Sequence, residues 1–235
     1  MQETPGENTG TGPDPIGGTP AAAPPPPHPE AAVHTGPAKG LVDRAKDIIL
    51  RPVQEWPIIE REPGTVGSVF VPYALILAAV GPIAGLIGGQ LFGYSLGFFT
   101  FKPPIGGAIA YAVVSYVLSL ASVYVLALIV DAMAPNFGGT KNQVSAVKLA
   151  VYSWTAAWLA GIFALFPPLA ILSIVGLYSL YLLYSGLPVM MKCPREKSGG
   201  YAAVVIGLAI ILWMVVGWLA WRLIVGMMMP TIPIG

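Results

Sequence analysis

The stretch LAVYSWTAAWLAGIFALFPPLAILSIVGLYSLYLLYSGLPVMM, residues 149–191, holds 43 residues without a charged side chain. A transmembrane helix needs about 20 predominantly apolar residues to cross about 30 Å of hydrocarbon, so this stretch is too long for one crossing. Pro167 and Pro168 interrupt it near its middle. Proline lacks the backbone N–H that continues a helix and restricts the residue before it. The stretch therefore predicts two membrane-spanning helices joined by a tight turn.

Three further uncharged intervals are also long enough to cross a membrane. They lie between Glu62 and Lys102, between Lys102 and Asp131, and between Lys197 and Arg222. Together with the first stretch they predict an all-α membrane protein, a bundle of five transmembrane helices. The expected transmembrane domain covers residues 69–229, with spans at residues 69–91, 106–130, 148–166, 169–191 and 201–225.

The basic residues support this count of spans and predict an orientation. With five spans, the N-terminal segment and two of the loops share one side of the membrane, and that side carries all of the 12 Lys and Arg residues except Lys102 and Arg222. The positive-inside rule then predicts a cytoplasmic N-terminus and an external C-terminus. If residues 149–191 formed a single span, the basic group at residues 192–197 would lie outside. Charge therefore favours five spans over four.

Composition agrees with a membrane location. The chain is 55% hydrophobic and 10% charged, and its mean hydropathy is +0.73, which is outside the range of soluble globular domains. The formal net charge is only +1, so no basic stripe predicts binding to nucleic acid. We expect a multi-pass protein of the bacterial cytoplasmic (inner) membrane. Its expected partners are the lipid bilayer and, as possibilities, other membrane proteins or further copies of the chain.

Two segments precede the expected spans. Residues 1–40 are rich in proline and glycine and poor in apolar bulk, which predicts a disordered cytoplasmic tail. Residues 41–68 form an amphipathic juxtamembrane segment, in which Arg44 and Lys46 are expected to lie near lipid headgroups. This segment is interpreted either as a lipid-bound anchor or as a docking surface for a cytoplasmic partner. At the other end, residues 230–235 form a short C-terminal tail. The apolar face of the juxtamembrane helix is expected to comprise Leu41, Val42, Ala45, Ile48 and Ile49.

Small and polar side chains mark three candidate features within the spans. Glycines four residues apart in the first span form a small-xxx-small pattern that permits close helix packing. Ionisable residues occur only near the predicted membrane interfaces, where an ion pair across the loop between the second and third spans is expected. A tyrosine stripe on the fourth span is interpreted either as interfacial or as lining a polar path. The packing residues are Gly81, Gly85 and Gly89, the ion pair is Asp131 with Lys148, and the stripe is Tyr178, Tyr181 and Tyr184.

Catalytic patterns are weak throughout the chain. The only histidines, His28 and His34, lie in the proline-rich tail, and Cys193 is the single cysteine. No spacing of Cys and His residues predicts a metal site, and no base lies near a plausible nucleophile. The sequence therefore predicts a protein that is not an enzyme and that has no catalytic, cofactor or metal site.

Several stretches carry a resemblance to a known family. They are RAKDIIL at 44–50, GPIAG at 81–85, DAMAPNFGG at 131–139, KLAVYS at 148–153 and GLYSLYLLYSGLP at 176–188. Together these resemble the bacterial branch of the Yip1 family of five-span membrane proteins, over about residues 41–224. The resemblance implies the fold and the topology. Eukaryotic members of the family act in vesicle trafficking between ER and Golgi and contact Rab GTPases, but this chain lacks their acidic Tyr-Gly-Pro element.

These observations lead to one main hypothesis of function and two alternatives. The main hypothesis is a non-enzymatic scaffold or organiser, or a trafficking-like adaptor, that acts through its helix surfaces and its cytoplasmic N-terminal segment. The first alternative is a permease or channel for a neutral or lipid-like substrate, because prolines and tyrosines could surround a cavity. The second alternative is an accessory subunit of a larger membrane complex.

Overall fold

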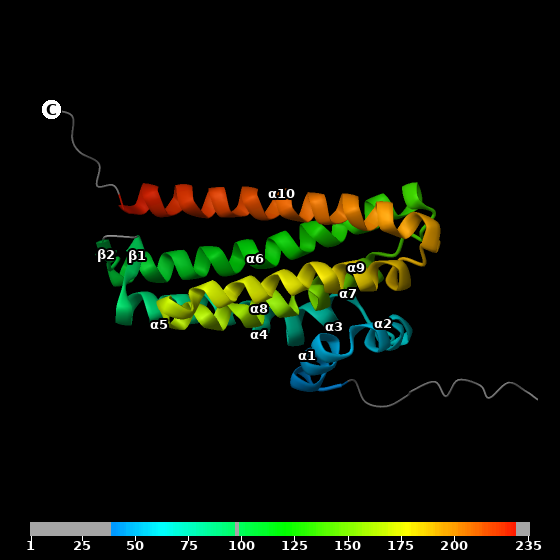
Figure 1. Cartoon of the computed structure of the whole chain (residues 1–235), viewed down its shortest axis with the longest axis horizontal. Coiled ribbons are helices and arrows are strands. Elements are labelled where there is room, and N and C mark those ends of the chain that lie inside the picture. Colours follow the sequence, from blue (N-terminus) through cyan, green and yellow to red (C-terminus); the bar gives the residue numbers. More distant parts are fainter. Residues whose placement is uncertain (1–38, 97–98, 229–235) are drawn as a thin grey trace, which may run out of the picture. The chain divides into compact units, whose positions relative to one another are not determined.

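The structure is a computed structural model that describes residues 39–96 and 99–228. Most of the two predicted tails, at residues 1–38 and 229–235, therefore lies outside the described residues. Figure 1 shows long helices lying side by side. Five helical segments are long and apolar enough to cross a membrane, which confirms the predicted all-α, five-helix membrane fold. These spans are Val66–Phe92, Ile105–Phe137, Gln143–Leu165, Pro168–Met190 and Arg195–Ala220.

The first span is irregular because prolines interrupt its backbone hydrogen bonds. It begins at a capping box, in which the side chains of Thr65 and Ser68 each accept a hydrogen bond from the other's backbone N–H. A π-helical turn surrounds Pro72, and a short break at Ala79 precedes Pro82, since neither proline can donate to the preceding turn. Its elements are α3 (Val66–Val69), η1 (Phe70–Ala74), α4 (Leu75–Ala78) and α5 (Val80–Phe92).

A short antiparallel hairpin, which the sequence did not predict, joins the first two spans. Strand β1 (Tyr94–Leu96) pairs with β2 (Phe99–Phe101), and Tyr94 lies opposite Phe101. The second span follows as the unbroken helix α6 (Ile105–Met133), extended by the 3-10 turn η2 (Ala134–Phe137). Gly138 ends this turn with φ of 73°, a left-handed conformation that glycine adopts without steric cost.

The third and fourth spans form the predicted helical pair with a turn before the two prolines. The chain turns at the extended residue Phe166, between the 3-10 segments η3 and η4. The third span is the most buried of the five, whereas less than a third of the residues are buried in each of the others, as expected for helices that face lipid. The elements are α7 (Gln143–Ser153), α8 (Thr155–Ala160), η3 (Gly161–Leu165), η4 (Pro167–Leu177) and α9 (Tyr178–Met190).

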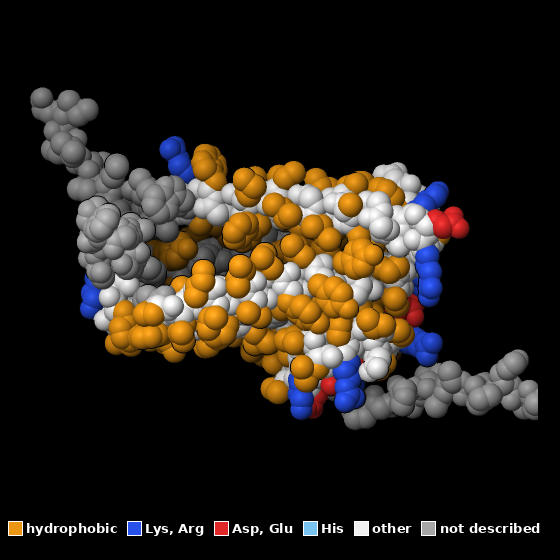
Figure 2. All heavy atoms as spheres, in the orientation of Figure 1, with side chains coloured by type: hydrophobic (Ala, Val, Ile, Leu, Met, Phe, Trp, Pro, Cys, Tyr) orange, Lys and Arg blue, Asp and Glu red, His pale blue; other side chains and the backbone are white. Residues whose placement is uncertain are grey.

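The last span, α10 (Arg195–Met228), packs mainly against α6, α9 and η2. In Figure 1 it lies along one edge of the bundle. Figure 2 shows hydrophobic side chains along the length of the helices, while acidic and many basic side chains gather at one end and around the first two helices. This separation is what a bilayer requires, because charged groups are costly in hydrocarbon.

Two short helices, α1 (Leu41–Leu50) and α2 (Pro52–Arg61), precede the spans. Pro52 occupies the first turn of α2, where a missing N–H costs nothing. Helix α2 packs against α9, and α1 packs against α2 and α8. The juxtamembrane segment is therefore a folded helical pair that lies against the bundle.

Candidate functional site

The most polar site is a charge cluster, which we define as Lys39, Arg44, Glu55, Glu62 and Lys148. Arg44 and Glu55 are each only 3% exposed. The guanidinium of Arg44 donates from Nη1 to Oε1 of Glu55 and from Nη2 to Oε1 of Glu62. Lys39 Nζ donates to both carboxylate oxygens of Glu55, at 2.8 and 2.9 Å. These contacts connect α1, α2 and the segment that leads into the first span.

Arg44 corrects the expectation that its side chain lies near lipid headgroups. Burial disfavours its charged form, but the hydrogen bond and charge of Glu62 outweigh that effect and raise the pKa of Arg44. The buried face of α1 consists of Arg44, Ala45 and Ile48, whereas Val42 is 73% exposed. The spacing of apolar residues in α1 predicted an exposed Arg44, because the pattern of one helix does not show that carboxylates of a following segment pair with its charge.

Lys148 attaches the third span to the end of α2. Its Nζ donates to the carbonyl oxygen of Ile59 at 3.0 Å and to that of Glu62. A lysine is favourable beside these carbonyls because the last turn of a helix leaves acceptors unpaired. The predicted Asp131–Lys148 ion pair is wrong: α2 lies over the start of α7 and occupies the ammonium, and Asp131 Oδ1 has no partner within the described part of the chain.

Aromatic side chains extend the charge cluster into the bundle. The guanidinium carbon of Arg44 lies 5.7 Å from the ring centroid of Tyr152, a cation–π distance. Tyr152 packs edge-on against Tyr73, with ring centroids 4.8 Å apart. The hydroxyl of Tyr73 lies 2.8 Å from that of Thr155, which also donates to the Tyr152 carbonyl. The buried charge is thus held on one side by carboxylates and on the other by a ring face.

Trp56 anchors α2 to the fourth span. Its side chain is fully buried, and its indole N–H donates to Ser185 Oγ at 3.1 Å. A methyl group at Gly186 would stand 2.4 Å from Trp56 Cε2 and 2.7 Å from Leu149 Cδ1. Only glycine leaves room for the indole at this position. The sequence reasoning missed this contact, although a glycine within the tyrosine-rich helix was a signal for it.

The glycines of the first span approach the third span within the same chain. A methyl group at Gly81 would lie 3.7 Å from Gly161 Cα, and one at Gly85 would lie 3.9 Å from Ala164 Cβ, both ordinary contacts. The tightest approach involves Gly88, where a methyl group would lie 2.3 Å from the Ala164 carbonyl oxygen. Gly89 is buried on the same helix. A methyl group at Gly161 would lie 2.7 Å from Gly81 Cα, so the predicted Gly81 is part of the close seam, together with Gly88 and Gly161.

The three tyrosines of the predicted stripe have different surroundings. Tyr178 donates its hydroxyl to the Ile49 carbonyl at 3.0 Å and so contacts α1. Its ring lies 5.3 Å from that of Tyr181. Tyr181 and Tyr184 are exposed on the flank of the bundle. None of the three lines the cavity described next.

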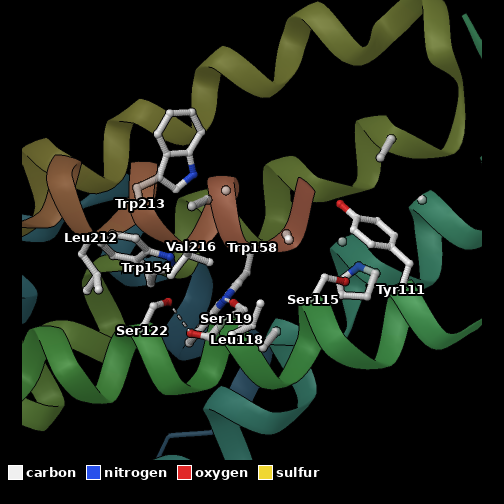
Figure 3. Close-up of a pocket in the computed structure, with 18 of the residues that line it drawn as sticks. Tyr111, Ser115, Leu118, Ser119, Ser122, Trp154, Trp158, Leu212, Trp213 and Val216 are labelled. Carbon is white, nitrogen blue, oxygen red and sulfur yellow. Dashed lines mark hydrogen bonds between the residues drawn. The ribbon is translucent and has the colours of Figure 1, made fainter. Parts of the chain in front are cut away.

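A cavity of about 450 Å³ lies within the transmembrane bundle. Its walls come from α5, α6, α8, η3 and α10. Figure 3 shows Tyr111 at one end, Ser122 and Leu212 at the other, and three tryptophans along it. Trp158 Nε1 donates to Ser119 Oγ at 3.0 Å, which fixes the indole against α6. The labelled lining residues are Tyr111, Ser115, Leu118, Ser119, Ser122, Trp154, Trp158, Leu212, Trp213 and Val216.

Neither site carries recognisable catalytic groups. Within residues 39–96 and 99–228, no group of three His, Cys, Asp or Glu residues could hold a metal ion. The two histidines of the tail lie outside this range. Cys193 is buried, and its thiol contacts the Phe137 carbonyl oxygen at 3.2 Å. Burial raises the pKa of the Cys193 thiol, which makes it a poor nucleophile.

Five apolar spans, with charged side chains gathered mainly at one end and around the first two helices, define an integral, multi-pass membrane protein. Residues 46–225 match the Yip1 domain, and the chain belongs to the Yip1 domain family. It is 28% identical over 178 residues to "Inner membrane protein YohC" of Escherichia coli K12, a match that covers 69% of this chain and 91% of that protein. The protein of the same name from Escherichia coli O6:H1 matches to the same extent. No solved structure gives a significant match.

Proposed function

We propose that this chain is a non-enzymatic scaffold of the bacterial inner membrane, which presents the α1–α2 pair to other membrane components. The observation that carries the proposal is the rigid attachment of this pair. Ion pairs of Arg44 join α1 to α2 and to Glu62, and Trp56 and Lys148 attach α2 to the fourth and third spans. A buried charge is retained at a cost in desolvation, and one established use of such groups is to specify a unique arrangement.

The outward face of α1–α2 supplies a surface that a partner could bind. Val42, Leu50 and Val53 are 73%, 65% and 66% exposed, although they belong to helices whose other faces are buried. Basic Lys46 and Arg51 are exposed on the same pair of helices. An apolar surface rimmed by charge is typical of interaction sites. The relative from Escherichia coli is described as an inner membrane protein, which supports the proposed location of this chain. That description names no activity.

The proposal needs a cytoplasmic α1–α2 pair, which the distribution of basic residues supports. Two exposed lysines test it: Lys141 lies between the second and third spans and Lys102 lies between the first and second. In a Cys193→Ser background, we expect Lys102→Cys to react with a membrane-impermeant maleimide in intact cells with a permeable outer envelope. Lys141→Cys should react only after lysis. The opposite pattern would place α1–α2 outside the cytoplasm.

The scaffold role is tested by crosslinking in cells, purification in a mild detergent and mass spectrometry. We expect a stoichiometric partner, either another membrane protein or a further copy of this chain. Substituting Val42, Leu50 and Val53 together by serine should abolish that crosslink. Serine substitution of Val113 and Val117, which are 55% exposed on α6 and lie away from α1–α2 in the sequence, is the control. Reproducible absence of any partner would refute the proposal, and a partner from a defined complex would instead identify an accessory subunit.

The intramembrane cavity supports a second candidate function, a permease for a neutral or lipid-like substrate. Its lining contains no charged side chain, which disfavours an ion-coupled mechanism. The assay is exchange of fluorescent phospholipid between the leaflets of proteoliposomes, compared with protein-free vesicles. Faster exchange that Gly217→Trp abolishes would support transport. Exchange at the protein-free rate would remove this candidate.

A further inference from the structure

We propose that the intramembrane cavity binds one acyl chain of an ester-linked bilayer lipid, with the ester group near Tyr111. The inference goes beyond the scaffold role, and it requires no transport. It rests on the dimensions of the cavity, its opening toward lipid and the chemistry of its lining.

The cavity has the length and volume that a single chain needs. Ser122 follows Tyr111 by 11 positions on α6, which corresponds to about 16 Å along the helix axis. This distance is close to half of the roughly 30 Å hydrocarbon core, the depth of one leaflet. The volume of about 450 Å³ falls within the roughly 300–1,000 Å³ of typical ligand pockets.

The cavity opens to the side of the bundle rather than only along its axis. Helix α10 makes its main contacts with α6, α9 and η2, and no comparable contact with α5, α8 or η3. The helices that wall the cavity are therefore not closed against each other on the α10 side. Figure 2 shows the surface hollowed between α10 and the helices beside it. A lipid chain can enter there from the surrounding bilayer without crossing the headgroup region.

The lining favours a hydrocarbon chain over water. A buried water needs about two to four polar partners. Ser115 and Ser122 already donate to carbonyls of their own helix, at 3.0 and 2.8 Å. Ser119 accepts the indole N–H of Trp158. The remaining wall consists mostly of alanine, leucine, glycine and aromatic side chains, whose polar groups are the Tyr111 hydroxyl and indole N–H groups, so a filling of ordered water would have few partners along most of the wall.

One polar group at the end of the cavity identifies the position of the ester. Tyr111 lies in the second turn of α6, near the start of the second span. Its hydroxyl makes no hydrogen bond within the described residues, although a partly buried tyrosine hydroxyl normally has a partner. An ester carbonyl accepts such a bond. Because the lining holds no charge, the phosphate of the lipid must remain outside, at the interface.

Photocrosslinking tests the proposal in vesicles that contain a phospholipid with a diazirine in its acyl chain. We expect lipid adducts, located by mass spectrometry, to concentrate on cavity-lining peptides of α5, α6 and α10. Gly217→Trp should remove most of these adducts by filling the cavity, because a Cβ at Gly217 meets no atom within 4 Å. Gly207→Trp, on the same helix but away from the cavity, has the same open surroundings and should keep them.

Two further measurements separate the outcomes. Tyr111→Phe should reduce crosslinking of the ester-linked lipid more than that of an ether-linked lipid with the same chain. Ser119→Cys should resist a water-soluble maleimide in the same vesicles. Equal adduct yields from Gly217→Trp and Gly207→Trp, both folded by circular dichroism, would overturn the proposal. Rapid modification of Ser119→Cys, which would show a water-filled cavity, would also overturn it, as would protein–protein adducts at the cavity in place of lipid.

Discussion

Replacing Glu55 by alanine removes the carboxylate at the centre of the charge cluster. The side chains of Glu55 and Arg44 are each 4% exposed in this pair. After the substitution, the buried guanidinium retains one carboxylate, that of Glu62, whose side chain is 28% exposed, beside the ring of Tyr152. Lys39 retains only Asp47, at 2.7 Å. The change therefore leaves a buried charge with half of its compensation.

The expected cost follows from these contacts. Removing one partner of a buried ion pair costs about 3–5 kcal/mol, because the other charge stays buried without compensation. Since Glu62 still binds Arg44, we expect the lower limit, about 3 kcal/mol, or about a hundredfold in an equilibrium constant. The loss should act on the packing of α1 against α2 rather than on the spans, since local opening requires less free energy than global unfolding.

Hydrogen–deuterium exchange in detergent or nanodiscs measures this effect. Amides of α1 and α2 should exchange about a hundredfold faster in Glu55→Ala, while those of α7 keep their protection. Asp47→Ala removes the exposed partner of Lys39 and is the matched control. Unchanged exchange of α1–α2 in Glu55→Ala would refute the reasoning that buried ion pairs hold these helices. An equal increase in Asp47→Ala would show that exposed charges do so.

Three other changes test separate contacts. Gly186→Ala forces a methyl group against the Trp56 ring and should cost about 1–3 kcal/mol in a thermal melt; no loss would show that the indole can move. Gly88→Ala places its methyl group against backbone carbonyls of the third span and should also cost about 1–3 kcal/mol. Its control, Gly207→Ala, adds a methyl group in open surroundings and should not destabilise the protein. Burial raises the pKa of Cys193, so its thiolate fraction is low at neutral pH. Alkylation by iodoacetamide should therefore be slow and should accelerate as pH rises. Alkylation as fast as that of free cysteine would contradict the buried position.

The membrane fold could be predicted because length and charge constrain it strongly. An uncharged stretch of 43 residues with two central prolines permits two crossings and not one. The structure turns at Phe166, directly before those prolines. The hairpin of β1 and β2 was not predicted, since strands of three residues are too short for their alternation of apolar and polar side chains to indicate a strand.

Contacts between distant segments could not be predicted from local patterns. Arg44 looked like a headgroup-binding residue because the helical pattern of α1 contains nothing that reveals Glu62 as its partner. Lys148 was paired with Asp131 because they flank one loop, yet its ammonium reaches carbonyls of α2, which lies more than eighty residues earlier. The glycine seam was placed on the correct helix and includes the predicted Gly81, but its tightest point was not identified, since that point depends on the partner helix. Gly88 has that role because the carbonyls of the third span lie against it.

The third span connects the two candidate sites. Lys148, in its second turn, binds the carbonyls that end α2, and Trp158, further along, forms part of the cavity wall. Because this span is the most buried of the five, it cannot shift at one site without repacking its neighbours at the other. The charge cluster is consequently the point at which the proposed partner of α1–α2 would act on the bundle, and the cavity lies at the other end of the same span. A scaffold with a lipid in its interior would in this way respond to both its partners and its membrane.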